Sequence, residues 1–416
     1  MEKKDKIILG LGCEYRVGEG GLNGNELIIG STGSGKTMSI SEPRILYSYE
    51  QSLVIPITKR ELFDRYAPLL ETRGYEVWDL NLAQPAISPM GYDPCRAIHS
   101  DLDVMNLARN IAGDSDSRSL VGEMDPYWSE ATTSCLAAIL GLTKFETKYN
   151  QKEFSFADFL NNYKSLKVTY KNGIFASSLD KAFDFMAFDD EDAQAPRLWN
   201  TIAGLSSKTA SCIISMVNNA IDKFATLEVE GIFRNENQIN IRELGQKKVA
   251  LFITTSPVNS SLKKLATILY SDIFKELFEE AQVNGGTLAN RVHIIADDFA
   301  CGSRIPRFDE YISVFRAAGI SISILLQSKS QLTTLYNPYA AHTIADNCDT
   351  IVFMGSLDIE TCREISMRTG YSVEEILNMP VGKEIVVRRG GTPVVTERYP
   401  IFEDRIYKKE VMERGE

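Results

Sequence analysis

Short apolar runs alternate with segments of helical periodicity in the first hundred residues. The apolar runs predict strands at 7–9, 27–29 and 52–55, and alternation of residue types predicts a strand at 75–80. Apolar positions spaced by three to four predict helices at 38–49 and 61–73. Pro43 should bend or delay the first helix, and Pro56 limits how centrally the strand before it can extend. This alternation is typical of a parallel α/β sheet.

The same alternation resumes at Lys248 and continues almost to the C-terminus. Strands are predicted at 249–254, 291–297, 320–326 and 350–354. Helices are predicted at 262–281, 308–318 and 359–369. Residues 383–389 and 393–396 should close the sheet as a hairpin, and the charged tail at 403–416 predicts a frayed helix.

The segment between these halves has a different pattern. Residues 101–224 show helical periodicity with no convincing strand pair, and the clearest helix is predicted at 198–224. Trp128 and Trp199 are interpreted as core residues. We therefore predict an α/β domain formed by residues 1–98 and 240–416, with an all-α domain at 99–239 inserted into it.

The length, charge and residue content of the chain argue against several classes of protein. A chain of 416 residues is long enough for two domains, and its net charge of −11 argues against a surface that coats nucleic acid. The seven cysteines include no C-x-x-C pair and predict reduced thiols, and three histidines make a histidine-rich metal centre improbable. No run of about 18 apolar residues predicts a membrane span.

A phosphate-binding loop follows the apolar run at 27–29. The pattern G-x-x-x-x-G-K-[ST] is formed by Gly30, Ser31, Thr32, Gly33, Ser34, Gly35, Lys36 and Thr37. Glycines let the backbone N–H groups converge on an anion at the start of the next helix. Lys36 should reach the β- and γ-phosphates, and the Thr37 hydroxyl should bind Mg²⁺. A chance Gly/Ser loop is the alternative, which the strand before and the helix after disfavour.

A second motif, VHIIADD, ends in two acids. An apolar strand at 292–296 delivers Asp297 at its end, where a Walker B aspartate holds Mg²⁺. Asp298 stands where a motor ATPase places the carboxylate that orients the attacking water. Together the motifs predict binding of ATP with Mg²⁺.

The stretch from Ile294 to Tyr336 resembles the signature of type IV secretion coupling proteins, the conjugation ATPases of the TraG/TraD type. The matching features are Phe299-Ala300, the turn Ile305-Pro306-Arg307-Phe308, Arg316 with Gly319-Ile320, and Gln327-Ser328. Further similarities are Arg73-Gly74-Tyr75, Asp125-Pro126-Tyr127-Trp128 and Asp346-Asn347-Cys348. The resemblance covers residues 25–135 and 245–370.

The resemblance implies a RecA-like P-loop NTPase domain that assembles as a hexamer with ATP between subunits. Arg316 stands at the position of the family's arginine finger, and Gln327 at that of its sensor of nucleotide state. The implied partners are single-stranded DNA, a relaxase and the proteins of a secretion channel or a membrane-anchored partner.

Three departures from the family pattern qualify this expectation. Asp298 replaces the usual Glu, and Ile57-Thr58-Lys59-Arg60-Glu61 replaces Asp-Pro-Lys-Gly-Glu, so an acid is lost beside the nucleotide. The family usually has a transmembrane anchor, and the sequence predicts none. We expect a cytoplasmic protein at the inner face of the bacterial membrane.

The sequence thus predicts an ATPase motor that moves relaxase-bound single-stranded DNA towards a secretion channel. Two alternatives stay open: an ATP-binding docking receptor with little hydrolysis, and a cytosolic DNA translocase of the FtsK/HerA kind. A small-molecule kinase is less consistent with the sequence. Candidate pore cations, each more typical of solvated surface, are Lys208, Lys223, Lys247, Lys248, Lys263, Lys264, Arg388 and Arg389.

Overall fold

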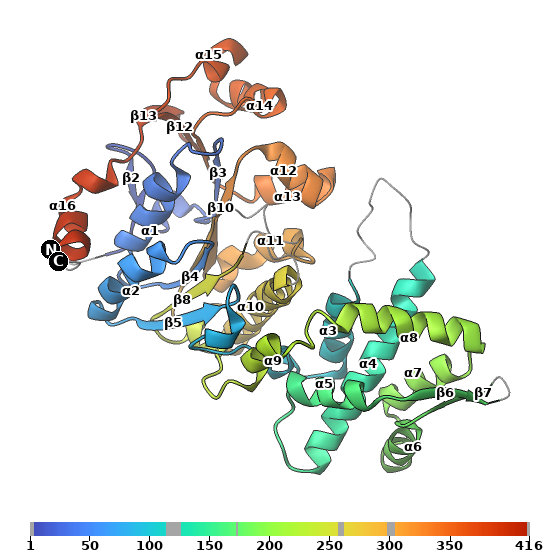
Figure 1. Ribbon diagram of the computed structural model, residues 1–416. Coiled ribbons are helices and arrows are strands. Elements are labelled where there is room, and N and C mark those ends of the chain that lie inside the picture. The colour runs from blue at the N-terminus through green and yellow to red at the C-terminus, as the bar shows by residue number, and fades with distance from the viewer. Residues whose placement is uncertain (1–3, 114–125, 172–173, 257–261, 298–303, 414–416) are drawn as a thin grey trace. The chain divides into compact units, whose positions relative to one another are not determined.

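The computed structural model describes residues 4–113, 126–171, 174–256, 262–297 and 304–413 (Figure 1). The chain divides into two compact units. The first comprises Met1–Ala83, Asn240–Thr267 and Ile273–Glu416, and the second comprises Gln84–Ile239 with Ile268–Asp272. The second unit thus starts at Gln84, whereas the sequence analysis placed the boundary at residue 98.

A nine-stranded sheet forms the centre of the first unit in the described chain, in the order β13-β12-β11-β3-β10-β9-β4-β8-β5. The strands from β11 to β5 are parallel, while β12 and β13 are antiparallel to their neighbours. The strands are β3 (Glu26–Ile29), β4 (Ser52–Ile57), β5 (Glu76–Asn81), β8 (Val249–Thr254), β9 (Val292–Ala296), β10 (Ile320–Leu326), β11 (Thr350–Phe353), β12 (Lys383–Arg388) and β13 (Val394–Glu397). The predicted α/β fold and the predicted closing hairpin are confirmed.

Helices cover both faces of this sheet, which explains why its central strands are continuous apolar runs. Helices α1 (Glu42–Leu46) and α2 (Glu61–Thr72) lie on one face, and α10 (Lys263–Val283) and α11 (Phe308–Ala318) lie on the other (Figure 1). The unit also contains β1 (Lys6–Ile8), β2 (Glu14–Arg16), α12 (Lys329–Leu335), α13 (Pro338–Asp346), α14 (Ile359–Thr369), α15 (Val373–Leu377) and α16 (Arg405–Tyr407). Short helical turns occur at Glu19–Gly21, Thr37–Ser41, Ile241–Gly245, Ile401–Glu403 and Lys408–Met412.

The two prolines affect their elements less than predicted. The helix starts at Thr37 as a π-helical stretch, Thr37–Ser41, and continues into α1 with Pro43 in its first turn, so the proline coincides with a change of helix type and does not delay the helix. Pro56 lies inside β4, which runs between β8 and β9. The ladder to β9 covers only Ser52–Val54, so Pro56 lies beyond the end of that pairing and interrupts no bond of it.

The second unit is mostly helical. Its elements are α3 (Asp101–Ala112), α4 (Pro126–Tyr149), α5 (Phe156–Ser165), α6 (Asp180–Asp189), α7 (Gln194–Ala203), α8 (Ser207–Ile221) and α9 (Leu227–Arg234), with turns at Pro85–Ile87 and Pro94–Ala97. Trp199 is buried and stacks on Phe183 at 4.8 Å, as predicted for a core residue, whereas Trp128 is only half-buried.

Two predictions for this unit are wrong. Strands β6 (Val168–Lys171) and β7 (Ile174–Ser177) form an antiparallel hairpin where only helices were expected. The helix predicted at 198–224 is divided into α7 and α8, because the chain turns at Gly204 and Ser206 begins a new helix. The Ser206 hydroxyl accepts a hydrogen bond from the Thr209 N–H, a normal N-cap contact.

Among the helices in the described part of the chain, none is both long enough and apolar enough to cross a membrane.

Candidate active site

Three predicted site segments meet at the carboxyl edge of the central sheet. The register pairs Ile29 of β3 with Leu326 of β10, and Ile324 of β10 with Ala296 of β9. The phosphate loop follows β3, Gln327 follows β10, and Asp297 follows β9. This edge of a parallel sheet is where α/β proteins place their ligands.

The phosphate loop has the conformation that its glycines permit. Gly33 and Gly35 have positive φ angles of 76° and 83°, which side chains disfavour. A Cβ atom on Gly30 would lie 2.4 Å from the Ser34 Oγ and 2.9 Å from the Met354 Cβ, so this position has no room for a side chain. The loop therefore requires glycine for backbone shape at two positions and for space at a third.

Polar groups of the loop are held ready for an anion. The Lys36 Nζ donates to the Gly30 carbonyl at 2.6 Å and to the Ser31 carbonyl at 3.3 Å. The Ser34 hydroxyl is buried without a hydrogen-bond partner among the described residues. A buried ammonium, a buried hydroxyl and the start of a helix form a group that suits phosphate oxygens.

The two halves of the predicted metal site are in direct contact. The Thr37 Oγ1 donates to the Asp297 Oδ2 at 2.6 Å, and the Ser41 Oγ donates to the same oxygen at 3.3 Å. Hydroxyl and carboxylate oxygens are the hard ligands that Mg²⁺ prefers. The donor set therefore fits Mg²⁺ beside a nucleotide's phosphates. Asp298, the predicted water-orienting acid, lies outside the described residues.

A buried polar network joins the strands beneath this site. Glu26, on the strand before the phosphate loop, forms an ion pair with Arg44 of α1 and accepts a hydrogen bond from Ser323 of β10 at 2.6 Å. The His293 Nε2 lies 2.9 Å from the Ser323 Oγ. Burial, and then the charge of Arg44, hold the pKa of His293 well below its usual value. The network connects the strand before the phosphate loop with the Walker B strand through hydrogen bonds. The sequence analysis did not predict it.

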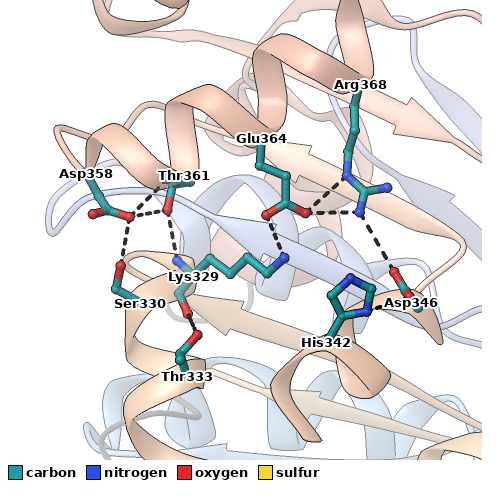
Figure 2. Close-up of polar contacts among 9 residues, drawn as sticks. All are labelled: Lys329, Ser330, Thr333, His342, Asp346, Asp358, Thr361, Glu364 and Arg368. Atoms are coloured by element: carbon teal, nitrogen blue, oxygen red, sulfur yellow. Dashed lines mark hydrogen bonds and ion pairs between the residues drawn. The ribbon is translucent and has the colours of Figure 1, made fainter. Parts of the chain in front are cut away.

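Gln327 stands between the phosphate loop and a polar cluster on the following helices. The Gly30 N–H donates to the Leu326 carbonyl at 3.0 Å, and the Gln327 N–H donates to the Gln331 side chain at 2.9 Å. Figure 2 shows α12 fixed to α14 just beyond: the Lys329 Nζ donates to Glu364 at 2.6 Å, and the Ser330 Oγ to Asp358 at 3.0 Å. Gln327 therefore lies between Leu326, which contacts the loop, and helix α12.

Arg316 lies at the opposite edge of the sheet. It is exposed near the end of α11, just before β10 begins at Ile320. Ile320 pairs with Val292 at the start of β9, so this is the edge of the sheet where these parallel strands begin. Because β10 is seven residues long, about 20 Å separates this edge from the phosphate loop. Arg316 cannot reach the nucleotide site of its own chain, which is the geometry that an arginine acting on a neighbour requires.

Comparison with protein families gives a direct match to this chain. The model described as "Type IV secretory system Conjugative DNA transfer" matches residues 1–373. The chain belongs to this family. The match spans the phosphate loop, Asp297, Arg316 and Gln327. A comparison with curated proteins finds no match.

Solved structures with the same fold include other conjugation proteins. The bacterial conjugative coupling protein TrwBdeltaN70 with sulphate has a TM-score of 0.66 and 16% identity, covering 91% of this chain and 86% of its own. TrwB with the ATP analogue ADPNP has a TM-score of 0.68 and 16% identity, covering 96% and 89%. VirB4 of Thermoanaerobacter pseudethanolicus has a TM-score of 0.55 and 10% identity, covering 96% and 97%. At these identities the likeness establishes the fold.

The segment that departs from the family pattern contains an ion pair. Arg60, just after β4, donates through Nη1 and Nη2 to the two carboxylate oxygens of Asp79 on β5 at 2.8 and 2.7 Å. Its Nη1 also donates to the Thr254 hydroxyl at 3.3 Å. Asp79, on the edge strand β5, is thus paired with an arginine of the altered segment.

Several of the candidate pore cations have structural partners. Lys248 donates to the carbonyls of Tyr49 and Arg73 at 3.0 and 2.6 Å. Lys247 pairs with Glu76 and Glu243, and Arg389 pairs with Asp349 at 3.1 Å. Lys248 is thus bound to the backbone of the first unit, whereas Lys247 and Arg389 form ion pairs at its surface.

Proposed function

We propose that this protein is an ATPase motor that couples relaxase-bound single-stranded DNA to a type IV secretion channel. The observation that carries the proposal is the 2.6 Å contact between Thr37 and Asp297, which joins the Walker A and Walker B segments at one edge of the sheet. Membership of the conjugative DNA transfer family supports the choice of cargo and channel.

Each residue of the site has a role that follows from its chemistry. Lys36 and the loop's N–H groups bind and orient the phosphates, and Thr37 with Asp297 holds Mg²⁺, which supplies charge neutralisation at the phosphates when bound. Asp298 is proposed to position the attacking water. Gln327 is proposed to sense nucleotide state, because its neighbour Leu326 contacts the loop and its own N–H donates to Gln331 of α12.

Arg316 supports a ring as the active form. An exposed arginine at the edge opposite its own phosphate loop can stabilise transition-state charge only on an adjacent subunit. We therefore propose a homohexamer when active, located at the inner face of the bacterial membrane through a membrane partner.

Lys36→Ala tests the foundation of this proposal. Removing the ammonium should reduce ATP hydrolysis by about 100-fold or more, since the charge that Lys36 brings to the β- and γ-phosphates is lost. The exposed Lys152→Ala, in the other unit, is the matched control and should hydrolyse ATP like the wild type. Undiminished turnover in Lys36→Ala would refute the assignment of the site.

A docking receptor that binds ATP but scarcely hydrolyses it is the second candidate. Asp298 in place of the family's Glu motivates it, together with the altered stretch at 57–61, which lacks the family's acid. This candidate predicts no stimulation of turnover by DNA or by Asp298→Glu, and cargo binding that survives Asp297→Asn. A cytosolic translocase of the FtsK/HerA kind is less favoured, because the family match is to conjugative DNA transfer.

A further inference from the structure

The last two strands of the sheet bring an arginine to the phosphate loop. In β12 and β13, Lys383 pairs with Glu397, so the residue after Glu397 lies at the carboxyl edge of β11. That residue is Arg398, whose N–H donates to the Gly382 carbonyl at 2.9 Å. Arg389, at the other end of the hairpin, lies at the opposite edge beside Asp349.

The Arg398 side chain extends over the second half of the loop. Its Nη2 donates to the Met354 carbonyl at 3.3 Å, at the end of β11. Its Nη1 lies 3.7 Å from the position that a Cβ atom on Gly35 would occupy. Its Nε is buried and has no hydrogen-bond partner among the described residues. A guanidinium with one carbonyl contact retains donors that can bind phosphate oxygens.

A buried acid whose pKa is affected by Arg398 does not neutralise this arginine. Glu384 of β12 is fully buried, and neither of its carboxylate oxygens has a hydrogen-bond partner in the described chain. Burial raises the pKa of Glu384 to about 8, against the opposing charge of Arg398, so the carboxyl is mostly uncharged at pH 7. Arg398 therefore presents a positive charge beside the loop at neutral pH.

We propose that Arg398 binds the phosphates of the nucleotide held by its own chain, as a second cation besides Lys36. The inference rests on the proposed function in so far as it assumes a nucleotide on this loop. Arg398 approaches from the β11 side of β3, whereas Asp297 and Gln327 lie on the β9 and β10 side. Because its Nη1 lies beside Gly35, in the part of the loop whose backbone N–H groups bind the α- and β-phosphates, the proposal places its contact on phosphates that ADP and ATP share. Arg398 lies beyond residues 1–373, where the family match ends.

Equilibrium binding of Mg-ADP and of a non-hydrolysable Mg-ATP analogue, measured by calorimetry, tests the inference. Arg398→Gln keeps a donor for the Met354 carbonyl but removes the charge. It should weaken binding of both nucleotides by about 10- to 100-fold, the value of a charged hydrogen bond. Arg389→Gln removes an exposed arginine at the far edge and should bind both nucleotides like the wild type.

The outcomes separate this inference from the proposed function. One outcome refutes the Arg398 inference and leaves the proposed function standing. In that outcome the wild type binds ADP, Lys36→Ala weakens the binding of ADP, and Arg398→Gln leaves the binding of ADP unchanged. If Lys36→Ala also binds like the wild type, the proposed nucleotide site itself fails. A loss confined to the ATP analogue would contradict the placement of Arg398. Should Arg398→Gln not fold, Arg398→Met decides, because it keeps a long side chain without the charge: binding weaker by about 10-fold or more supports the inference, and wild-type binding overturns it.

Discussion

Replacing Glu384 by Gln should stabilise the protein at neutral and alkaline pH. The carboxyl is fully buried on β12, packed against Gly10, and has no hydrogen-bond partner in the described chain. Ionising such a group carries the full cost of desolvation, which Arg398 only partly offsets. Gln has the same shape and no charge, so the substitution removes this cost without opening a cavity.

The pH dependence follows from the two pKa values of Glu384. Its pKa rises from 4.5 to about 8 on folding, so between these values the folded protein holds a proton that the unfolded chain has lost. The contribution of Glu384 to stability therefore falls as pH rises through this window and is constant above it. At 1.36 kcal/mol per pKa unit the limit is about 5 kcal/mol. Local relaxation reduces this figure, and we expect about 2–4 kcal/mol.

Urea unfolding of wild type and Glu384→Gln from pH 4.5 to 8.5 measures this effect. The variant should match the wild type near pH 4.5 and exceed its free energy of unfolding by about 2–4 kcal/mol at pH 8.5. Taking the difference between the two proteins cancels the other titrating groups. The control Glu397→Gln, at an exposed position on β13, should show no such trend. A difference that does not vary with pH would refute the reasoning.

Three further predictions concern the rest of the site. Glu26→Gln leaves Arg44 without its buried counter-charge and should lower the free energy of unfolding by about 3–5 kcal/mol, measured with urea. Asp297→Asn should weaken Mg²⁺-dependent nucleotide binding at least 10-fold in calorimetry, while binding without Mg²⁺ changes little. Arg316→Ala should bind nucleotide normally but lose about 10³-fold in turnover. Mixing it with Lys36→Ala should restore part of that turnover, because one variant supplies the arginine and the other the phosphate loop.

Controls distinguish these effects from general damage. Glu14, an exposed acid on β2 paired with Lys6, provides Glu14→Gln as the control for Glu26, with a change of at most about 1 kcal/mol expected. Arg307, exposed and paired with Glu310, provides Arg307→Ala as the control for Arg316. If Arg316→Ala retains full turnover, or if its mixture with Lys36→Ala shows no gain, catalysis across a subunit interface is contradicted.

The sequence predicted the parts of the fold that local patterns encode. The central strands are apolar on both faces and the phosphate loop has a fixed spacing, so β3, β9 and β10 were predicted correctly. The break between α7 and α8 was missed because apolar spacing continues through Gly204, and only the Ser206 cap marks the new helix. The β6–β7 hairpin was missed although Val168–Lys171 alternates apolar and polar residues and is followed in the sequence by Asn172-Gly173, because these short runs were outweighed by the helical periodicity around them.

The site was predictable only where residues adjoin a motif. Lys36, Thr37 and Asp297 lie within or beside recognisable patterns, and the structure brings Thr37 and Asp297 together. The pairing of β12 with β11 places Arg398 and Glu384 near the site. No local sequence pattern predicts this pairing. The Glu26–Arg44 pair is likewise a product of packing, since α1 must fold back onto β3 before the charges meet.

ATP turnover as a function of protein concentration, with and without single-stranded DNA, tests the central claim most directly. A motor that completes its site with Arg316 of a neighbour should show turnover that rises more than linearly with protein and is stimulated by DNA. Turnover near zero at every concentration, with tight ATP binding and no response to DNA, would contradict the motor and favour the docking receptor.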